Sequence, residues 1–237
     1  MGITLMLLAA VCAFIQSTVG FGFNIMYMAA GPYFMEYGLA QVMCFCGTSV
    51  GNVANVLPRI KKINIRQVIV PTISYCIFTF ISIRLTMGLE TELLRKLLGI
   101  LLFALSIYFV FFSGKITIKP TALNSIIAGA ISGVGGGIFA INGPPMVVYY
   151  LSALNDKEEY MATIQTFFFI TSIATIAIKV ATGTFEIMQP LWFLFTAAGV
   201  VIGAFVGMKT YKRLNANAVR LCVYAFMALS GLWIFIS

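Results

Sequence analysis

Apolar residues occur in long continuous runs along this chain, and polar residues gather in short segments between the runs. Most runs hold about 20 residues, the length that a helix needs to cross a hydrocarbon core of about 30 Å. The alternating short strands of a membrane barrel are absent from the pattern. The sequence therefore predicts an all-α polytopic membrane protein with about eight hydrophobic segments, at residues 2–37, 40–57, 68–87, 97–112, 122–154, 160–181, 190–208 and 218–235.

Two of these segments have the wrong length for simple crossings. As one helix, residues 2–37 would be about 54 Å long at a rise of 1.5 Å per residue, too long for one crossing and too short for two. The segment contains the motif STVGFG at 17–22, and the other long segment contains SGVGGG at 132–137 and GPP after Asn142. Each glycine costs roughly 1 kcal/mol and proline roughly 3 kcal/mol inside a helix. We therefore expect a broken or re-entrant helix in each.

These two broken regions begin two similar halves of the chain. Each is followed by three more hydrophobic segments, and the polar stretch near the midpoint separates the halves. We interpret the order as an internal duplication. The predicted first repeat is 1–112, the linker is 113–121, and the second repeat is 122–237. The first segment, from Ile3, lacks a basic start and a small-residue cleavage site, so we expect it to be retained in the membrane.

The basic residues discriminate between two topologies. If each broken region crosses once, lysine and arginine divide 7 to 8 between the two sides, with no bias. If each turns back or crosses twice, the halves are inverted and the division is 11 to 4. The larger set is Arg59, Lys61, Lys62, Arg66, Lys115, Lys119, Lys157, Lys209, Lys212, Arg213 and Arg220, and the smaller is Arg84, Arg95, Lys96 and Lys179. The positive-inside rule favours inverted halves with both termini on the non-cytoplasmic side.

Composition narrows the class further. The chain is 61% hydrophobic and 9% charged, whereas soluble domains carry about 25% charged residues. The net charge of +8 lies in short loops that set topology, so it does not indicate nucleic acid. The chain has no histidine, and its five cysteines lie in apolar runs without metal-ligand spacing. We expect no cofactor, no metal and no enzymatic activity.

The candidate binding residues lie at the two breaks and on the neighbouring segments. Glycines at a half-helix N-terminus expose backbone N–H groups, which favour anions without a formal cation, and nearby amides and hydroxyls add donors. A break in each half of a transporter indicates its binding site. The alternative is that these glycines only allow close helix packing. The candidates are Ser17, Gly20, Gly22, Asn24, Thr48, Asn52, Ser132, Gly135, Gly136, Gly137, Asn142, Gln165 and Thr166.

Ionisable residues inside membranes are candidates for function. Arg84, a possible charge partner, and Lys179 are the two in hydrophobic segments, both near segment ends where snorkelling is easy. All seven acidic residues fall in loops or at segment ends, so a buried carboxylate relay is not expected and a proton could travel on the substrate. The lack of a buried carboxylate also argues against a cationic substrate.

The two glycine motifs, the chain length and the two-repeat order resemble the TauE/SafE sulfite-exporter family. The resemblance covers nearly the whole chain, although Phe21 and Phe23 stand where smaller residues are usual. It implies a plasma-membrane (inner-membrane) permease for a small sulfur-containing anion such as sulfite or an organosulfonate, usually exported.

We therefore expect a multi-pass secondary transporter whose partners are the lipid bilayer and a small inorganic or organic anion. The alternatives are a small-anion channel, which would show neither saturation nor trans-stimulation, and a non-transport scaffold subunit. The sequence leaves the oligomeric state open, with a homodimer as one alternative.

Overall fold

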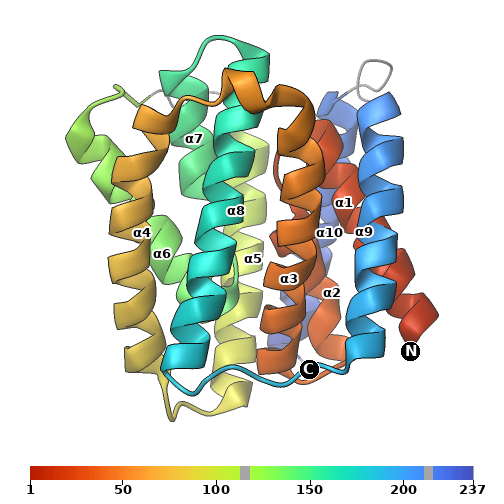
Figure 1. Cartoon of the computed structure of the whole chain (residues 1–237). Helices are drawn as coiled ribbons and strands as arrows, with labels where there is room; N and C mark the ends of the chain where they lie inside the picture. The colour runs from red at the N-terminus through yellow and green to blue at the C-terminus, as the bar shows by residue number, and fades with distance from the viewer. Residues whose placement is uncertain (113–117, 211–215, 237) are drawn as a thin grey trace.

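The computed structural model describes residues 1–112, 118–210 and 216–236, and these residues form helices without any strand. Figure 1 shows their arrangement as an upright bundle. The α-helices are α1 (Gly2–Val19), α2 (Phe23–Ala30), α3 (Tyr37–Val56), α4 (Ile65–Thr86), α5 (Thr91–Phe112), α6 (Ala122–Phe139), α7 (Gly143–Ala153), α8 (Lys157–Ala181), α9 (Pro190–Thr210) and α10 (Ala216–Ile236). Short 3-10 helices at Gly31–Tyr33 and Leu57–Lys62 flank α3.

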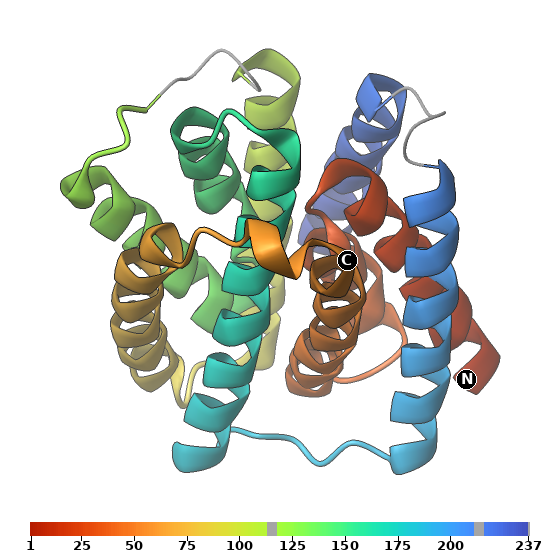
Figure 2. The same ribbon diagram turned by 45° about the horizontal axis from the view of Figure 1, so that its top comes forward.

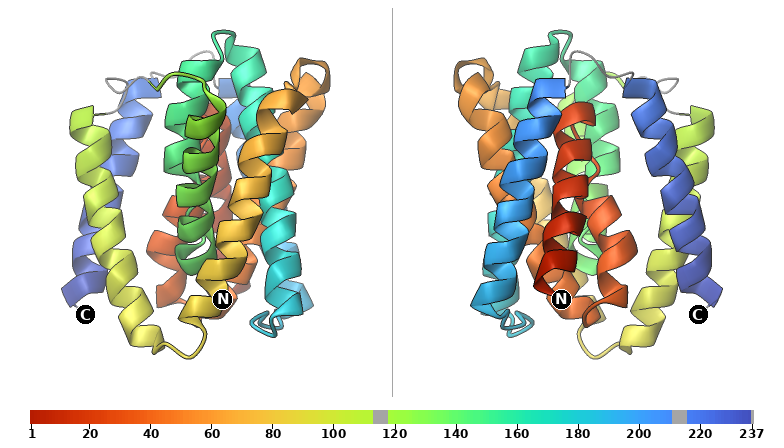
Figure 3. Two further views of the ribbon diagram at one scale, coloured as in Figure 1. Left: turned by 90° about the vertical axis from the view of Figure 1, so that its left-hand side faces the viewer. Right: turned by 90° about the vertical axis from the view of Figure 1, so that its right-hand side faces the viewer.

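Both long hydrophobic segments are broken helices that turn back. In Figures 1 and 3, α1 rises from the lower end of the bundle, and α2 returns to that end, where α3 begins. In the second half, α6 descends from the upper end, and α7 returns upward to the start of α8. Corresponding helices of the two halves therefore run in opposite directions, the arrangement that an inverted repeat requires. Both chain termini lie at the lower end (Figure 3).

Figure 2 shows two groups of helices side by side. One group contains α1, α2 and α3 from the first half with α9 from the second, and the other contains α6, α7 and α8 from the second half with α4 from the first. The remaining helices, α5 and α10, pack mainly on each other. Each group thus takes its broken pair from one half and one helix from the other, so the halves interlock. The boundary between the two predicted repeats is not tested by this arrangement and stays a prediction. Residues 113–117 of the linker lie outside the described residues.

Glycines hold these exchanged helices together. On α9, Gly199 and Gly203 lie directly against the backbone carbonyls of α1, and on α6, Gly129 and Gly133 lie against those of α4. A Cβ atom at any of the four would collide with a carbonyl oxygen. Spacing of four residues places such glycines on one helix face, the small-residue packing that is typical of membrane helices. Close backbone contact therefore joins the two halves.

Where the two groups meet, α3 packs against α8. Both helices bury a row of polar side chains, which we call the polar stripe, although α8 is otherwise apolar enough to cross a membrane. All members are at most 4% exposed: Gln41, Thr48, Asn52 and Asn55 on α3, and Gln165, Thr171, Thr175 and Lys179 on α8. Burying so many polar groups is costly unless each finds a partner, so their partners define where a polar solute could bind.

The predicted fold class is confirmed, with six of the described helices long and apolar enough to cross a membrane. The basic residues gather mainly at one end of the bundle. Arg59, Lys61 and Lys62 lie on the upper 3-10 helix, and Lys157 and Lys209 lie at the upper ends of α8 and α9 (Figure 1). Three other members of the predicted basic set, Lys115, Lys212 and Arg213, lie outside the described residues, as does the side chain of Arg220.

Candidate functional site

The first break follows α1 and depends on two glycines. Gly20 has φ 94° and Gly22 has φ 114°, backbone conformations that side chains with a Cβ rarely adopt. Phe21, between them, is buried and stacks on Phe109 of α5 with ring centroids 5.3 Å apart. The break therefore redirects the chain without backbone strain, and an aromatic contact fixes its position.

The second break follows α6 and is built differently. Ala140 has φ 56° and ψ 22°, the left-handed conformation, although it carries a Cβ. The chain then folds back so that the Ile141 N–H donates to the Gly135 carbonyl at 3.1 Å. A Cβ at Gly135 would collide with the Ile141 carbonyl oxygen. Gly135 therefore provides the space for this break, and α7 begins at Gly143 with prolines in its first turn.

The two breaks meet in the interior of the protein. The Asn24 Nδ2 donates to the Ala140 carbonyl oxygen at 2.8 Å, across 116 positions of sequence. The Thr48 hydroxyl of α3 donates to the Asn24 Oδ1 at 2.5 Å. Asn24 is 8% exposed and Thr48 is 1% exposed. The amide of one half thus satisfies a carbonyl that the break in the other half leaves unpaired.

The reciprocal contact comes from α8. The Gln165 Nε2 donates to the Gly20 carbonyl oxygen at 2.8 Å, and Gln165 Oε1 accepts from the Gln16 Nε2 at 2.9 Å. Gln16 Nε2 also donates to Asn52 Oδ1 at 2.5 Å. These four groups form one buried amide network that joins α1, α3 and α8 and closes the polar stripe above the breaks.

Below the breaks, further members of the stripe have partners. Asn142 Nδ2 donates to the Thr171 hydroxyl at 3.3 Å. The Thr175 hydroxyl lies 2.8 Å from the Tyr75 hydroxyl of α4. Polar side chains of the stripe therefore follow one another along α8 from Gln165 down to its lower end.

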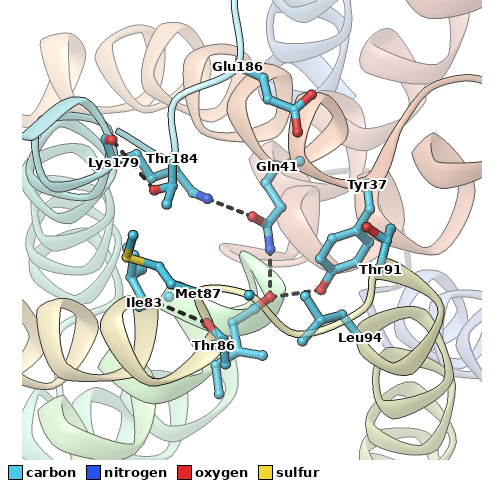
Figure 4. A pocket seen from close by; sticks show the side chains of 14 residues that line it. Tyr37, Gln41, Ile83, Thr86, Met87, Thr91, Leu94, Lys179, Thr184 and Glu186 are labelled. Carbon is cyan, nitrogen blue, oxygen red and sulfur yellow. Dashed lines mark hydrogen bonds between the residues drawn. The ribbon is translucent and has the colours of Figure 1, made fainter. Parts of the chain in front are cut away.

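At its lower end the stripe opens into a cavity of about 190 Å³, which we call the Lys179 cavity (Figure 4). The Lys179 Nζ donates to Gln41 Oε1 at 2.8 Å, and Gln41 Nε2 donates to the Ile138 carbonyl oxygen at 2.6 Å. The Tyr37 hydroxyl donates to the same carbonyl at 2.7 Å. Since Ile138 lies in the last turn of α6, the cavity is connected directly to the second break.

Lys179 is the buried cation of this cavity, with 4% of its surface exposed. Among the described residues, ion pairs join Arg59 to Glu158 and Lys96 to Glu92, and Lys179 takes part in neither. An ammonium group has three donors, and burial of a charge is costly unless the charge is paired. A neutral amide alone does not neutralise it. The arrangement therefore favours an anion in the cavity beside Lys179.

One carboxylate, that of Glu186, also lines the cavity. Glu186 lies in the segment between α8 and α9, outside the helices (Figure 4). Partial burial raises the pKa of Glu186, and the nearby Glu36 carboxylate raises it further. Lys179 and the backbone N–H of Leu39 act in the opposite direction without reversing the rise.

The upper end of the stripe differs, because its cation is paired. Arg59 Nε lies 2.6 Å from Glu158 Oε2, and its guanidinium also donates to the Asn55 carbonyl at 3.1 Å. The Asn64 side chain donates to Glu159 Oε1 at 2.9 Å. These contacts tie the 3-10 helix after α3 and the start of α4 to the start of α8.

The second helix break does not lie within the glycine-rich motif, where the sequence pattern predicted it. Residues 133–137 are regular helix within α6, and the break follows at 140–142. Gly136 and Gly137 do not lie at a helix N-terminus. A Cβ at Gly136 would collide with the Tyr75 hydroxyl of α4, and one at Gly137 with the Ser82 hydroxyl. Helix packing explains why both positions are glycine, because α6 and α4 lie too close together there to leave room for a side chain.

The structure brings most of the remaining candidates together. Gly20, Asn24, Thr48, Asn52, Asn142 and Gln165 share the contacts around the breaks, and Gly22 begins α2 beside them. Ser17 and Ser132 are buried, with hydroxyls that have no hydrogen-bond partner among the described residues.

Two candidates point elsewhere. Thr166 bonds the Ala162 carbonyl of its own helix and lines an apolar hollow with Val53 and Phe169. Arg84 is exposed, with its guanidinium 5.6 Å from the Phe80 ring centroid, and it does not line the Lys179 cavity.

Three polar residues of this region received little or no weight from the sequence. Gln16 and Gln41 are single amides in apolar surroundings, and Lys179 lies near the end of its segment, where snorkelling is expected. The helical spacing of Thr175 and Lys179, four residues apart on one face of α8, was an available signal for the stripe.

The fold and the site together define a polytopic helical membrane protein with paired helix breaks and a buried polar path, an arrangement typical of membrane transporters. The family model described as "Sulfite exporter TauE/SafE" matches residues 5–234, so the chain belongs to this family of membrane permeases. Comparison with curated proteins and with solved structures gives no match.

Proposed function

We propose that this protein is a secondary transporter for a small sulfur-containing oxyanion, such as sulfite or an organosulfonate, and that Lys179 is its charge partner. The observation that carries the proposal is the buried, unpaired ammonium of Lys179 in a small polar cavity. The breaks lie next along the path, where Asn24 and Asn142 supply amide groups. The family supplies the class of permease.

The size of the cavity favours a small anion. Pockets for drug-sized ligands have volumes of roughly 300–1,000 Å³, and the Lys179 cavity has about 190 Å³. Hydroxyl groups of Thr86, Thr91 and Thr184 line it beside Lys179. The Thr86 hydroxyl now donates to the Ser82 carbonyl, and the Thr184 hydroxyl lies 2.9 Å from the Thr182 hydroxyl. A hydroxyl that rotates away from these partners can donate to an oxygen atom of the anion, while Lys179 balances its charge.

Membrane orientation follows from the basic residues. Because they gather at the upper end, the positive-inside rule assigns that end to the cytoplasm. Both termini and the Lys179 cavity then face the non-cytoplasmic side of the plasma membrane. In an exporter, a cavity open to this side, with Arg59 and Glu158 paired at the other end, is the state that releases substrate.

A carrier is favoured over a channel. Gln16, Asn52 and Gln165 are at most 3% exposed and bonded to one another, so the path is blocked between the two ends of the stripe. A substrate can pass only if these contacts rearrange, which predicts saturable flux and trans-stimulation. A scaffold subunit would need neither the cavity nor its cation. A homodimer stays a prediction.

Uptake into proteoliposomes tests the proposal. Labelled sulfite, sulfate and methanesulfonate are offered to wild type, Lys179→Met and Lys179→Arg, with Lys96→Met as the control at the same end of the bundle. We expect saturable flux of at least one anion, a loss of about 100-fold in Lys179→Met, partial activity in Lys179→Arg and normal flux in the control. A loss of about 100-fold corresponds to one charge-assisted contact of roughly 3 kcal/mol. Wild-type flux in Lys179→Met would remove Lys179 from the site.

A further inference from the structure

Glu186 enters the Lys179 cavity from the segment that joins α8 to α9. The backbone N–H of Leu39, in the first turn of α3, favours the charged form of its carboxylate. The next turn provides Gln41, the hydrogen-bond partner of Lys179. An acid and a cation therefore face one small cavity, and both contact the start of α3.

The position of Glu186 depends on a close approach to α3. A Cβ at Gly38 would collide with Glu186 Oε1, so the carboxylate lies directly over the Gly38 backbone. The lower end of the cavity is thus formed by a carboxylate held on a helix N-terminus, where a negative charge is stabilised. Glu186 and Lys179 are not in ion-pair contact, so the ammonium stays free to bind another anion.

Three titratable groups of the described residues lie beside Glu186. Lys179 faces it from α8, Glu36 lies just before α3, and Tyr37 lines the same cavity. Because burial raises the pKa of Glu186 and Glu36 raises it further, Glu186 takes up a proton more readily than an exposed glutamate. An anion bound at Lys179 would act on Glu186 in the same direction as Glu36.

We propose that Glu186 is the proton-binding residue of the Lys179 cavity, and that an anion binds there together with a proton on Glu186. This inference rests on the proposed function, because it requires an anion beside Lys179. The proton comes from the solution on the open side of the cavity and converts the carboxylate to the neutral acid. Without it, two negative charges would share one small cavity at a cost in affinity.

The sign of the pH dependence follows. At low pH Glu186 is protonated, and the anion meets Lys179 without a competing charge. As the pH rises through the raised pKa of Glu186, the carboxylate forms and affinity falls. A probe that does not titrate itself, such as methanesulfonate, should therefore bind more tightly at about pH 5 than at about pH 7, a range in which Lys179 keeps its charge. The difference should be roughly tenfold if binding of the probe shifts the pKa of Glu186 by about one unit.

The test measures binding of methanesulfonate, sulfate and chloride to the purified full-length chain in nanodiscs at both pH values. In Glu186→Gln we expect binding at least as tight as that of wild type at low pH, with no pH dependence. Gly38→Ala, which displaces the carboxylate without changing charge, should reduce the pH dependence. Glu90→Gln, an exposed loop carboxylate at the same end, and Glu36→Gln should retain it.

The outcomes separate the two proposals. If no anion binds at either pH, or if Lys179→Met binds as well as wild type, the proposed function fails, and this inference fails with it. If wild type binds and Lys179→Met does not, the function stands. In that case a flat wild-type profile, a pH dependence that survives in Glu186→Gln, or one lost in Glu36→Gln alone overturns the role of Glu186.

Discussion

The two helix breaks occupy corresponding places in the two halves of the chain, yet their backbones are built differently. The first places glycine at both positive-φ positions, Gly20 and Gly22. The second places an alanine, Ala140, in the left-handed conformation, which costs roughly 1–2 kcal/mol for a residue with a Cβ. Thus the first break is relaxed, and the second is held in place against a local cost.

The contacts around the breaks show what holds the second one. Asn24 donates to the Ala140 carbonyl, and Gln41 and Tyr37 donate to the Ile138 carbonyl two residues earlier. At the first break, the described residues supply one such donor, Gln165, to the Gly20 carbonyl. Since Gln41 is also the partner of Lys179, the strained break is the one connected to the cavity. A change at Lys179 would therefore act first on the second break.

Packing of α6 on α4 supports this break, and the largest effect is expected when that packing is lost. Gly133→Leu would drive a side chain into the Tyr75 carbonyl of α4, so we expect a loss of more than about 3 kcal/mol of stability and little folded protein. The neighbouring Val134→Leu is the matched control, because Val134 is 39% exposed on the outer face. Thermal unfolding of the detergent-extracted protein measures both. Equal unfolding temperatures would show that α6 does not depend on this contact.

A substitution at Gly135 should have a smaller effect on stability, because Gly135 provides space for the second break and not for packing of α6 on α4. Gly135→Ala places a Cβ against the Ile141 carbonyl, so the chain cannot fold back after Ala140 as it does now. We expect about 1–3 kcal/mol of destabilisation and a clear loss of anion flux. In the control Gly143→Ala, the new Cβ would meet its nearest neighbour, Phe168, at 3.7 Å, an ordinary contact, so stability and flux should be retained. Normal flux in Gly135→Ala would contradict a role for the second break.

Much of the fold could be predicted, because long apolar runs, basic loops and segment lengths depend on the membrane and not on tertiary detail. The lengths of residues 2–37 and 122–154 required breaks, and both are broken. The location of the second break could not be obtained from propensity. Glycine is unfavourable in an isolated helix, but in α6 the loss is offset by backbone contact with α4, which the sequence does not show.

The residues of the candidate site could be predicted where corresponding positions of the two halves have the same role. Asn24 and Asn142 are 118 positions apart and both lie at breaks, and Thr48 bonds Asn24. Thr166, 118 positions after Thr48, instead bonds its own helix, and Thr171 takes the place beside Asn142. Helix rotation decides which threonine faces the break, and it depends on packing between the two groups of helices. The sequence did not show whether the Lys179 side chain snorkels to the membrane interface or is buried, because that depends on which face of α8 packs against the other helices.

The smallest expected effect has the opposite sign and tests the strain itself. In Ala140→Gly the left-handed conformation becomes free of its cost of roughly 1–2 kcal/mol, while glycine loses about 0.5–1 kcal/mol more backbone entropy on folding. The net expectation is a gain of up to about 1.5 kcal/mol. At Gly22, by contrast, introducing alanine should only destabilise, because φ there is 114°. Chemical denaturation in matched detergent can compare the two variants with wild type. A loss of stability in Ala140→Gly would mean that the second break is as relaxed as the first, and that the connection to Lys179 does not act on a strained element.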